Sequence, residues 1–361
     1  MELVKIKYPS LSGLRAISIL MVITHHLCLL EHVLNDYYQY KWLVPLIEFI
    51  QDGHLGVNVF FVISGFLITS LMMREEEQTG KISLKNFYLR RTLRIFPAYY
   101  FMLLVYFILQ LAGVLQISPA SWLSSITYTK YFNWSLDWYT AHGWSLSIEE
   151  QFYILWPLVF IFGKTSRKIV ALTLFLAVPV LRVIVFYYPA DWLNEMTLFM
   201  RIDAIATGCL FAIYKDRIIK TLQPYWRMMF YLSVLCLFVL RYLPEQATKV
   251  HLEFIFIPLG VTAGTLANLL VAFIMMYSVF GPPGLWSGFL NLKPVAFVGL
   301  LSYSLYLWQQ AFMNVSGHWM TRFPQNVFFM FAAALFSYYL VEKPFLKLKT
   351  KFQARVTTEH R

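Results

Sequence analysis

Long apolar segments dominate this sequence and decide what it can fold into. Each comes close to the length of helix that crosses about 30 Å of hydrocarbon. They occupy residues 11–32, 55–74, 97–115, 144–163, 168–187, 196–214, 225–243, 254–279, 296–314 and 324–346. Because lipid offers no hydrogen bonds to the backbone, each span must satisfy its own N–H and C=O groups as a helix. We therefore predict an all-α, polytopic membrane bundle of about ten transmembrane helices, forming one domain over residues 1–361.

The composition points the same way. Hydrophobic residues make up 59% of the chain and charged residues only 14%, which lies outside the range of ordinary soluble domains. Cys28, Cys209 and Cys236 fall in apolar runs without the spacing of a zinc site or a disulfide framework, so we interpret them as core residues. The sequence has no metal-binding spacing and no Gly-rich nucleotide loop, and we expect no metal.

The placement of the basic residues predicts the orientation. The chain has 30 Lys and Arg against 19 Asp and Glu, an excess that fits either nucleic acid or a membrane surface. Most of the excess lies in alternate loops and in the tail, at Arg74, Lys81, Lys85, Arg90, Arg91, Arg94, Lys164, Arg167, Lys168, Lys215, Arg217, Lys220, Lys347, Lys349, Lys351, Arg355 and Arg361. The other loops hold only the scattered Lys41, Lys130, Arg241, Lys249 and Arg322. By the positive-inside rule we predict a multi-pass protein of the cell (inner or cytoplasmic) membrane, with both termini cytoplasmic, lipid as a partner and no nucleic acid.

Arg15 and His26 form a polar pair within the first apolar segment. Eleven helical residues make about three full turns, so the two side chains project from one face about 16 Å apart, while His25 points about 80° away. Ionisable groups at such depth are costly and mark functional sites. Because the ordinary pKa of histidine lies near neutrality, we predict that His26 is a general base.

Other polar residues fall in the outer half of the predicted bilayer. They are His25, Glu149, Glu150, Arg182, Arg201, Asp203, Gln309 and Gln310, with His54 and His142 just outside. We expect them to line a cavity open to the extracytoplasmic side. Purely structural roles are the alternatives: Ser147 and Glu150 fit a capping box, and His25 fits a hydrogen bond between helices. Arg201 and Asp203 face about 200° apart on a helix, so one of them is expected to pair between helices.

Residues 83–97, SLKNFYLRRTLRIFP, interleave basic and apolar side chains. One interpretation is an amphipathic helix lying at the cytoplasmic interface. The other is a phosphate site, because Arg91 and Arg94 share one helical face and guanidinium groups match phosphate geometry. Arg15, at the same depth, would join them. In the preceding span, Gly65 indicates close helix packing.

Several motifs together resemble the integral-membrane acyltransferase family 3, of the polysaccharide O-acetyltransferase type. They are SLSGLRAISILMVITHH (residues 10–26), GVNVFFVISGFLIT (56–69), FYLRRTLRIFPAYY (87–100), GWSLSIEEQFYILWP (143–157), RIDAIATGCLFA (201–212), LSYSLYLW (301–308) and VEKPF (341–345). The resemblance covers nearly the whole chain. It departs at Asn58, where the family often has Asp, and at Gln309, where a histidine commonly follows YLW. We also see no appended esterase-like domain of the kind that some relatives carry.

The resemblance implies an enzyme that transfers an acyl group, most often acetyl, from acetyl-CoA or another acyl-CoA to an extracytoplasmic carbohydrate or small-molecule acceptor. The predicted site then comprises three sets. The catalytic set is His26, Glu149 and Glu150; the donor-binding set is Arg15, Arg90, Arg91 and Arg94; the substrate cavity is His25, Trp144, Arg201 and Asp203. Glu149 or Glu150 would orient the His26 imidazole. Transfer directly to a hydroxyl and transfer through an acyl-histidine both remain open.

A transporter or flippase for a sugar-linked lipid is the alternative, because polar groups at depth also mark translocation paths. The sequence shows neither an inverted repeat nor a matching pair of broken helices, which that class favours. A membrane sensor or scaffold is a third class, in which the outer polar cluster would be dispensable.

Overall fold

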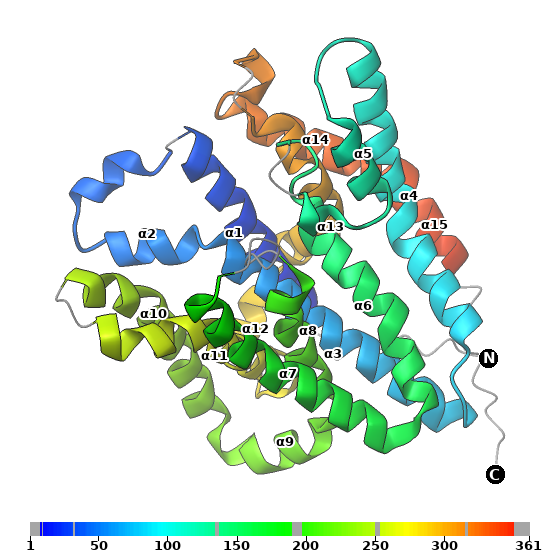
Figure 1. Cartoon of the computed structure of the whole chain (residues 1–361), viewed down its shortest axis with the longest axis vertical. Coiled ribbons are helices and arrows are strands. Elements are labelled where there is room, and N and C mark those ends of the chain that lie inside the picture. Colours follow the sequence, from blue (N-terminus) through cyan, green and yellow to red (C-terminus); the bar gives the residue numbers. More distant parts are fainter. Residues whose placement is uncertain are drawn as a thin grey trace. The chain divides into compact units, whose positions relative to one another are not determined.

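The computed structural model describes residues 8, 10–31, 33–133, 137–189, 197–249, 253–314 and 317–349, without the side chains of residues 35, 241–261 and 349. Every regular element in this part of the chain is helical, as Figure 1 shows, so the predicted all-α class is confirmed. The predicted cytoplasmic ends fall on residues 1–7 and 350–361, outside the described residues.

Each predicted apolar segment falls on a long helix, although α4 begins before its segment and α14 ends before its own. They are α1 (Leu11–Glu31), α3 (Gly53–Thr79), α4 (Leu84–Leu111), α6 (Gly143–Ile161), α7 (Gly163–Tyr187), α8 (Leu198–Ile213), α10 (Trp226–Lys249), α11 (Glu253–Phe280), α13 (Lys293–Phe312) and α14 (Gln325–Ser337). Shorter helical elements connect them: η1 (Asn35–Gln39), α2 (Val44–Ile50), α5 (Pro119–Ile126), η2 (Lys130–Phe132), α9 (Lys215–Leu222), η4 (Gln223–Tyr225), α12 (Leu285–Leu290), η5 (Trp319–Thr321), η6 (Tyr338–Glu342) and α15 (Lys343–Lys349).

Seven stretches of the described chain are long and apolar enough to cross a membrane. These are Leu11–Glu31, Gly53–Thr79, Leu84–Leu111, Gly163–Tyr187, Lys215–Leu240, Thr262–Phe280 and Gln325–Leu348. The other three predicted spans coincide with α6, α8 and α13, which are helical but fall outside that set. The chain is a multi-pass membrane protein, and the figure of about ten spans stays a prediction.

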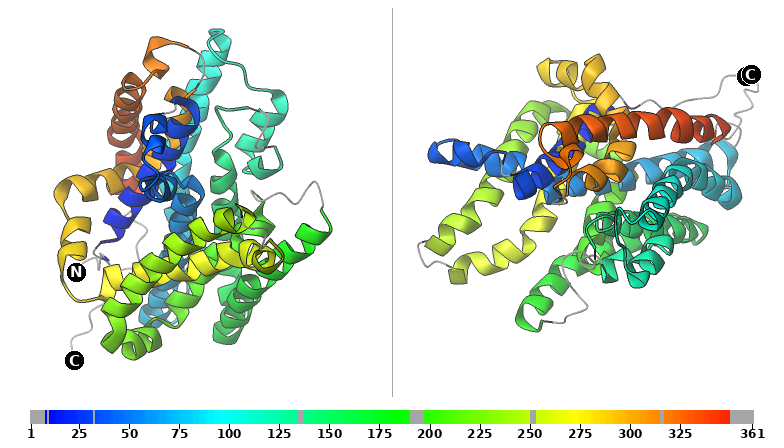
Figure 2. Two further views of the ribbon diagram at one scale, coloured as in Figure 1. Left: turned by 90° about the vertical axis from the view of Figure 1, so that its left-hand side faces the viewer. Right: turned by 90° about the horizontal axis from the view of Figure 1, so that it is seen from above.

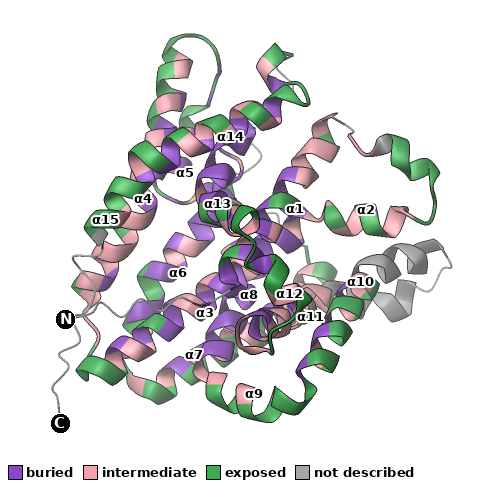
Figure 3. Ribbon diagram, turned by 180° about the vertical axis from the view of Figure 1, so that it is seen from behind, coloured by how far each residue is buried: buried purple, intermediate pink, exposed green. Residues whose placement is uncertain are grey.

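One face of α7 shows what surrounds the protein. Ile169, Leu172, Leu176, Val180 and Ile184 recur every three or four residues, and each is between 48% and 59% exposed. Such a stripe would promote association in water, whereas hydrocarbon solvates it. In contrast, α8 is buried along most of its length and the polar α9 is not, as Figure 3 shows. The pattern is that of helices packed inside a bilayer.

The chain divides into two compact units, each described by itself. The first comprises Leu71–Ile161 and the described part of Leu301–Arg361; the second comprises Tyr8–Ser70 and Phe162–Leu300. The motifs divide in the same way. Those of α1, α3 and α8 lie in the second unit, and those of α4, α6, η6 and the second half of α13 lie in the first.

In the second unit, α7 packs along α8 and α10 packs along α11, as can be followed in Figure 2. The approach of α3 to α8 is closer still. A Cβ on Gly65 would lie 2.0 Å from the Ile205 carbonyl oxygen, and one on Gly208 would lie 2.1 Å from that of Val62. The prediction that Gly65 permits close helix packing is confirmed.

In the first unit, hydrogen bonds between side chain and backbone join α4 to its neighbours. The Tyr88 hydroxyl donates to the Ile154 carbonyl of α6 at 2.8 Å, and the Tyr303 hydroxyl of α13 donates to the Ile95 carbonyl at 2.9 Å. The Ser304 hydroxyl donates to the buried Glu342 carboxylate at 2.9 Å, which links α13 to η6. These contacts bring together segments far apart in the sequence.

Candidate functional site

His25 of α1 is held by contacts with the turn between α2 and α3. Nδ1 of His25 is 3.0 Å from the Gln51 carbonyl oxygen, so this nitrogen donates and the ring is held between two segments. A Cβ on Gly53 would lie 2.8 Å from the Cβ of His25, so only glycine allows this approach. The hydrogen bond of His25 is therefore made to the turn that ends α2, and not within a second helix. Its ring lies 5.4 Å from that of His26 and 5.9 Å from that of His54.

Arg201 joins this histidine cluster from α8. Its Nη2 lies 3.4 Å from Nδ1 of His54, and its Nη1 donates to Oδ1 of Asn58 at 3.3 Å. Because a guanidinium can only donate, Nδ1 of His54 is the acceptor. Asn58 is uncharged, so at this position Arg201 has a neutral partner where the resembled family often has a carboxylate. His54 thus belongs to the cluster around His25 and His26.

Asp203 faces away from that cluster and binds other helices. Its carboxylate is fully buried and accepts from Arg182 at 2.9 Å, Thr265 at 2.6 Å and Asn268 at 3.1 Å. Both oxygens are engaged, tying α8 to α7 and α11. As the spacing predicts, Arg201 and Asp203 bind different partners. We therefore keep Arg201 in the candidate cavity and interpret Asp203 as a helix-linking residue.

The arginines of α4 stand on one continuous helix. Ser83 caps it by accepting from the Asn86 N–H, and the helix runs through Pro97 to Leu111, so residues 83–97 are the first turns of a long helix and not a separate interfacial one. Arg90 pairs with Glu75 at 2.6 Å. Neither Arg91 nor Arg94 forms an ion pair with another described residue.

Arg91 connects the predicted donor site to the acidic motif of α6. Its guanidinium carbon lies 3.8 Å from the centre of the Tyr153 ring, a cation–π contact, and its charge acts on the Glu150 carboxyl group. Glu150 is only 6% exposed, and its Oε1 has no hydrogen-bond partner among the described residues. The first unit thus holds a cation and a buried carboxyl group close together.

The capping box considered for Ser147 and Glu150 is wrong. Helix α6 already begins at Gly143, and the Ser147 hydroxyl donates to the Gly143 carbonyl at 2.8 Å inside its first turns. A helix that starts four residues earlier leaves the first-turn backbone N–H groups out of reach of Ser147. Trp144 lies buried in that first turn, and Glu149 is partly exposed one residue before Glu150.

Of the predicted site residues, the second unit gathers His25, His26 and Arg201, with Arg15 on the same helix as the histidines. The first unit gathers Arg91, Glu149 and Glu150, with Arg94 one turn further along α4 and Trp144 at the start of α6. Each unit supplies one part of the predicted chemistry: an imidazole cluster in one, guanidinium and carboxyl groups in the other. In the described residues no group of three His, Cys, Asp or Glu could hold a metal ion.

A buried polar network around Lys130 was not predicted as a site. Lys130 pairs with Asp137 at 2.6 Å, and their side chains are 0% and 5% exposed. Burial lowers the pKa of Lys130, and Asp137 opposes this effect. Burial also lowers the pKa of His142 to about 4, so its ring is neutral and its Nδ1 donates to Oε1 of Gln310. The sequence signal was Lys130 itself, a lysine in a loop otherwise poor in basic residues.

Comparison with known proteins places the chain in a family. The model of the Acyltransferase domain family matches residues 8–342. O-acetyltransferase OatA of Staphylococcus aureus strains NCTC 8325 and MRSA252 is 30% identical over 332 residues, covering 83% of this chain and 49% of the relative. SACOL0978 of strain COL, which carries a provisional O-acetyltransferase name, is 29% identical over 95% of this chain and 58% of its own length.

The chain spans about half the length of these curated relatives. No solved structure matches it significantly. The family match extends across both compact units, includes the motifs from α1 to α13 and ends within VEKPF. The chain therefore belongs to the Acyltransferase domain family of membrane proteins.

Proposed function

We propose that this protein is a membrane O-acyltransferase that moves an acyl group, most simply acetyl, from cytoplasmic acyl-CoA to a hydroxyl of an extracytoplasmic carbohydrate or related acceptor. The family match and the O-acetyltransferase names of its relatives support the reaction class. The donor, the acceptor and the roles of individual residues are our assignments.

One observation carries the proposal furthest. Arg91 and Arg94 of α4 form no ion pair with a carboxylate among the described residues, whereas Arg90 on the same helix does. Arg90 is neutralised by Glu75, whereas Arg91 and Arg94 keep their charges available, and Arg91 also approaches Glu150. Charge-assisted bonds from such guanidinium groups suit the phosphates of an acyl-CoA. The proposed donor set is therefore Arg91 and Arg94, and Arg15 joins it from the sequence prediction.

His26 is assigned as the general base. It removes the proton of the acceptor hydroxyl, whose oxygen attacks the thioester carbonyl carbon; the carbon–sulfur bond breaks, and the CoA thiolate takes up the proton. An acyl-histidine route would also need this imidazole. His26 is preferred to His25 because it shares one face of α1 with Arg15, whereas His25 points about 80° away and is held by the Gln51 carbonyl and by contact with Gly53.

The two adjacent histidines allow a matched test. Purified protein in nanodiscs is incubated with radiolabelled acetyl-CoA and a polysaccharide acceptor, and ester-bound label is measured. We expect His26→Ala to reduce the rate by at least about 100-fold, the contribution of a general base, and His25→Ala to keep most of it. Mass spectrometry of surface glycans with and without the protein identifies the acceptor as the one that loses an acyl mass.

Full activity of His26→Ala, with protein inserted in wild-type amounts, removes His26 from the mechanism. Transport of substrate without any ester formed favours a transporter or flippase instead.

A further inference from the structure

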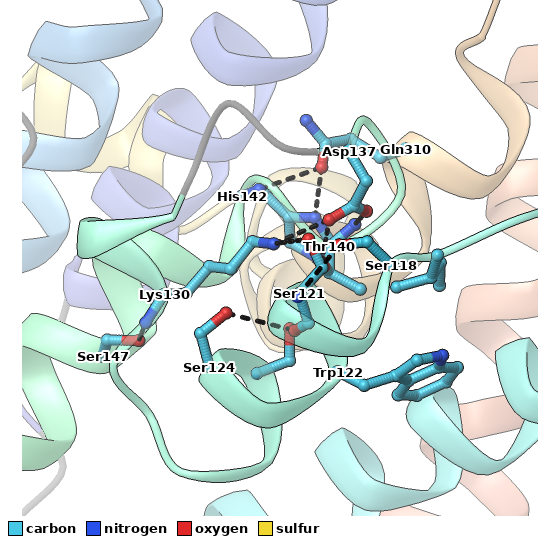
Figure 4. Close-up of polar contacts among 12 residues, drawn as sticks. Ser118, Ser121, Trp122, Ser124, Lys130, Asp137, Thr140, His142, Ser147 and Gln310 are labelled. Carbon is cyan, nitrogen blue, oxygen red and sulfur yellow. Dashed lines mark hydrogen bonds and ion pairs between the residues drawn. The ribbon is translucent and has the colours of Figure 1, made fainter.

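Lys130 is the most completely buried charged side chain of the first unit among the described residues, and it lies in η2, between α5 and α6. Figure 4 shows its ammonium group between two oxygens: it donates to the Asp137 carboxylate at 2.6 Å and to the Ser121 hydroxyl at 3.0 Å. A buried ammonium is tolerated only when paired in this way.

Asp137 links Lys130 to the turn that precedes α6. Its carboxylate accepts from the Thr140 backbone N–H and from the Thr140 hydroxyl, both at 2.7 Å. These bonds, with the one from Lys130, lower the pKa of Asp137 although burial alone would raise it. These bonds favour the carboxylate form of Asp137, which holds the turn from Asp137 to Thr140.

Lys130 also forms a hydrogen bond with α6 itself. Its backbone N–H donates to the Ser147 hydroxyl at 3.1 Å, and that hydroxyl donates to the Gly143 carbonyl at 2.8 Å. Lys130 thus attaches to α6 at one point and to the turn leading into α6 at another. These two attachments restrain the start of α6.

The other side of the turn is held from α13. The His142 N–H donates to Oε1 of Gln310 at 3.0 Å, and the Tyr306 hydroxyl donates to the His142 carbonyl at 3.0 Å. Ser145 in the first turn of α6 also hydrogen-bonds the Tyr306 hydroxyl. Hydrogen bonds from η2 and from α13 therefore hold the start of α6 on two sides.

Stability alone does not account for the ion pair. Replacing a buried pair by apolar or neutral residues of similar volume is often neutral or stabilising, whereas directional charge-assisted bonds define one geometry. The helix held in this way carries Trp144, Glu149 and Glu150. We propose that the Lys130–Asp137 pair is a positioning element that sets the start of α6 and thereby the acidic residues of the active site.

This inference rests on the proposed acyl transfer. Its test also measures amide exchange, which does not depend on that activity. Lys130→Met with Asp137→Asn removes both charges, keeps the side-chain volumes and leaves an amide oxygen for the Thr140 N–H. The exposed pair Lys215–Asp216, 3.7 Å apart, provides the matched control Lys215→Met with Asp216→Asn. Lys130→Met alone leaves a buried carboxylate and should lower the melting temperature by roughly 5 to 10 °C.

For the double variant we expect a melting temperature within roughly 3 °C of wild type. Amide exchange in residues 137–150 should be faster by about tenfold or more. We also expect kcat to fall by about tenfold or more with KM for acyl-CoA unchanged, because a misplaced reacting group costs rate and not donor binding. The control pair should change none of these quantities.

Wild-type exchange and kcat in the double variant would overturn the proposal. If the double variant does not fold, Thr140→Val, which removes the hydroxyl through which Asp137 holds the turn before α6, should still accelerate exchange in residues 137–150. Unchanged exchange in that variant would also overturn the proposal. If wild-type protein transfers no acyl group, the proposed function fails, and the exchange measurement alone decides whether the pair fixes α6.

Discussion

Three arginines within one turn of α4 have different surroundings, and the difference should appear in the kinetics. Arg90 is committed to Glu75, while Arg91 lies over Tyr153 and Arg94 has no ion-pair partner in the described chain. A charge-assisted bond contributes about 1.5–3 kcal/mol, or roughly 10- to 100-fold in affinity. We expect Arg91→Gln and Arg94→Gln each to raise KM for acyl-CoA by about tenfold or more, in assays of initial rate against donor concentration.

Arg90→Gln is the matched control on the same helix. It leaves Glu75 without its partner, so we expect a lower melting temperature with KM for the donor close to wild type. An equal rise of KM in all three variants would contradict the distinction between a paired arginine and two available ones.

Among elements, the crossing of α3 and α8 depends on two glycines that let the backbones touch. The Cβ of an alanine at position 65 would meet the Ile205 carbonyl at 2.0 Å, a backbone atom that cannot rotate away. We expect Gly65→Ala to push the helices apart and to destabilise the protein by roughly 1–3 kcal/mol, measured as a lower melting temperature in detergent.

Gly288 in α12 provides the control for that substitution. A Cβ there meets nothing within 4 Å, so Gly288→Ala should leave the melting temperature unchanged or raise it slightly, because alanine favours a helix. If Gly65→Ala melts like wild type, the close crossing is not required for stability.

The helix α4 shows how an element can be predicted in part. Its apolar half was predicted as a span from residue 97, and its basic half was considered as a separate helix. The structure shows one helix with Pro97 inside it. The sequence pattern predicts which side of each half is apolar. It does not predict that the two halves form one helix, which packs against α6 and α13 through Tyr88 and Tyr303.

At the scale of the whole molecule, the apolar segments and motifs were sufficient to predict the helical class and the family. They could not predict which polar residues pair. Asp203 was placed in the cavity because its depth is that of Arg201, but its partners Thr265 and Asn268 come from a helix more than 60 residues away. The sequence similarly showed Lys130 only as a basic residue in a loop where the positive-inside rule predicts few.

The central claim is that the acyl group crosses the membrane from donor to acceptor, and sided proteoliposomes test it most directly. Acetyl-CoA labelled in the acetyl group is sealed inside the vesicles, and an impermeant polysaccharide is added outside. The account predicts ester-bound label on the external polysaccharide, and its loss in His26→Ala. Ester formed only when both substrates share one side, or movement of a substrate without ester, would contradict it.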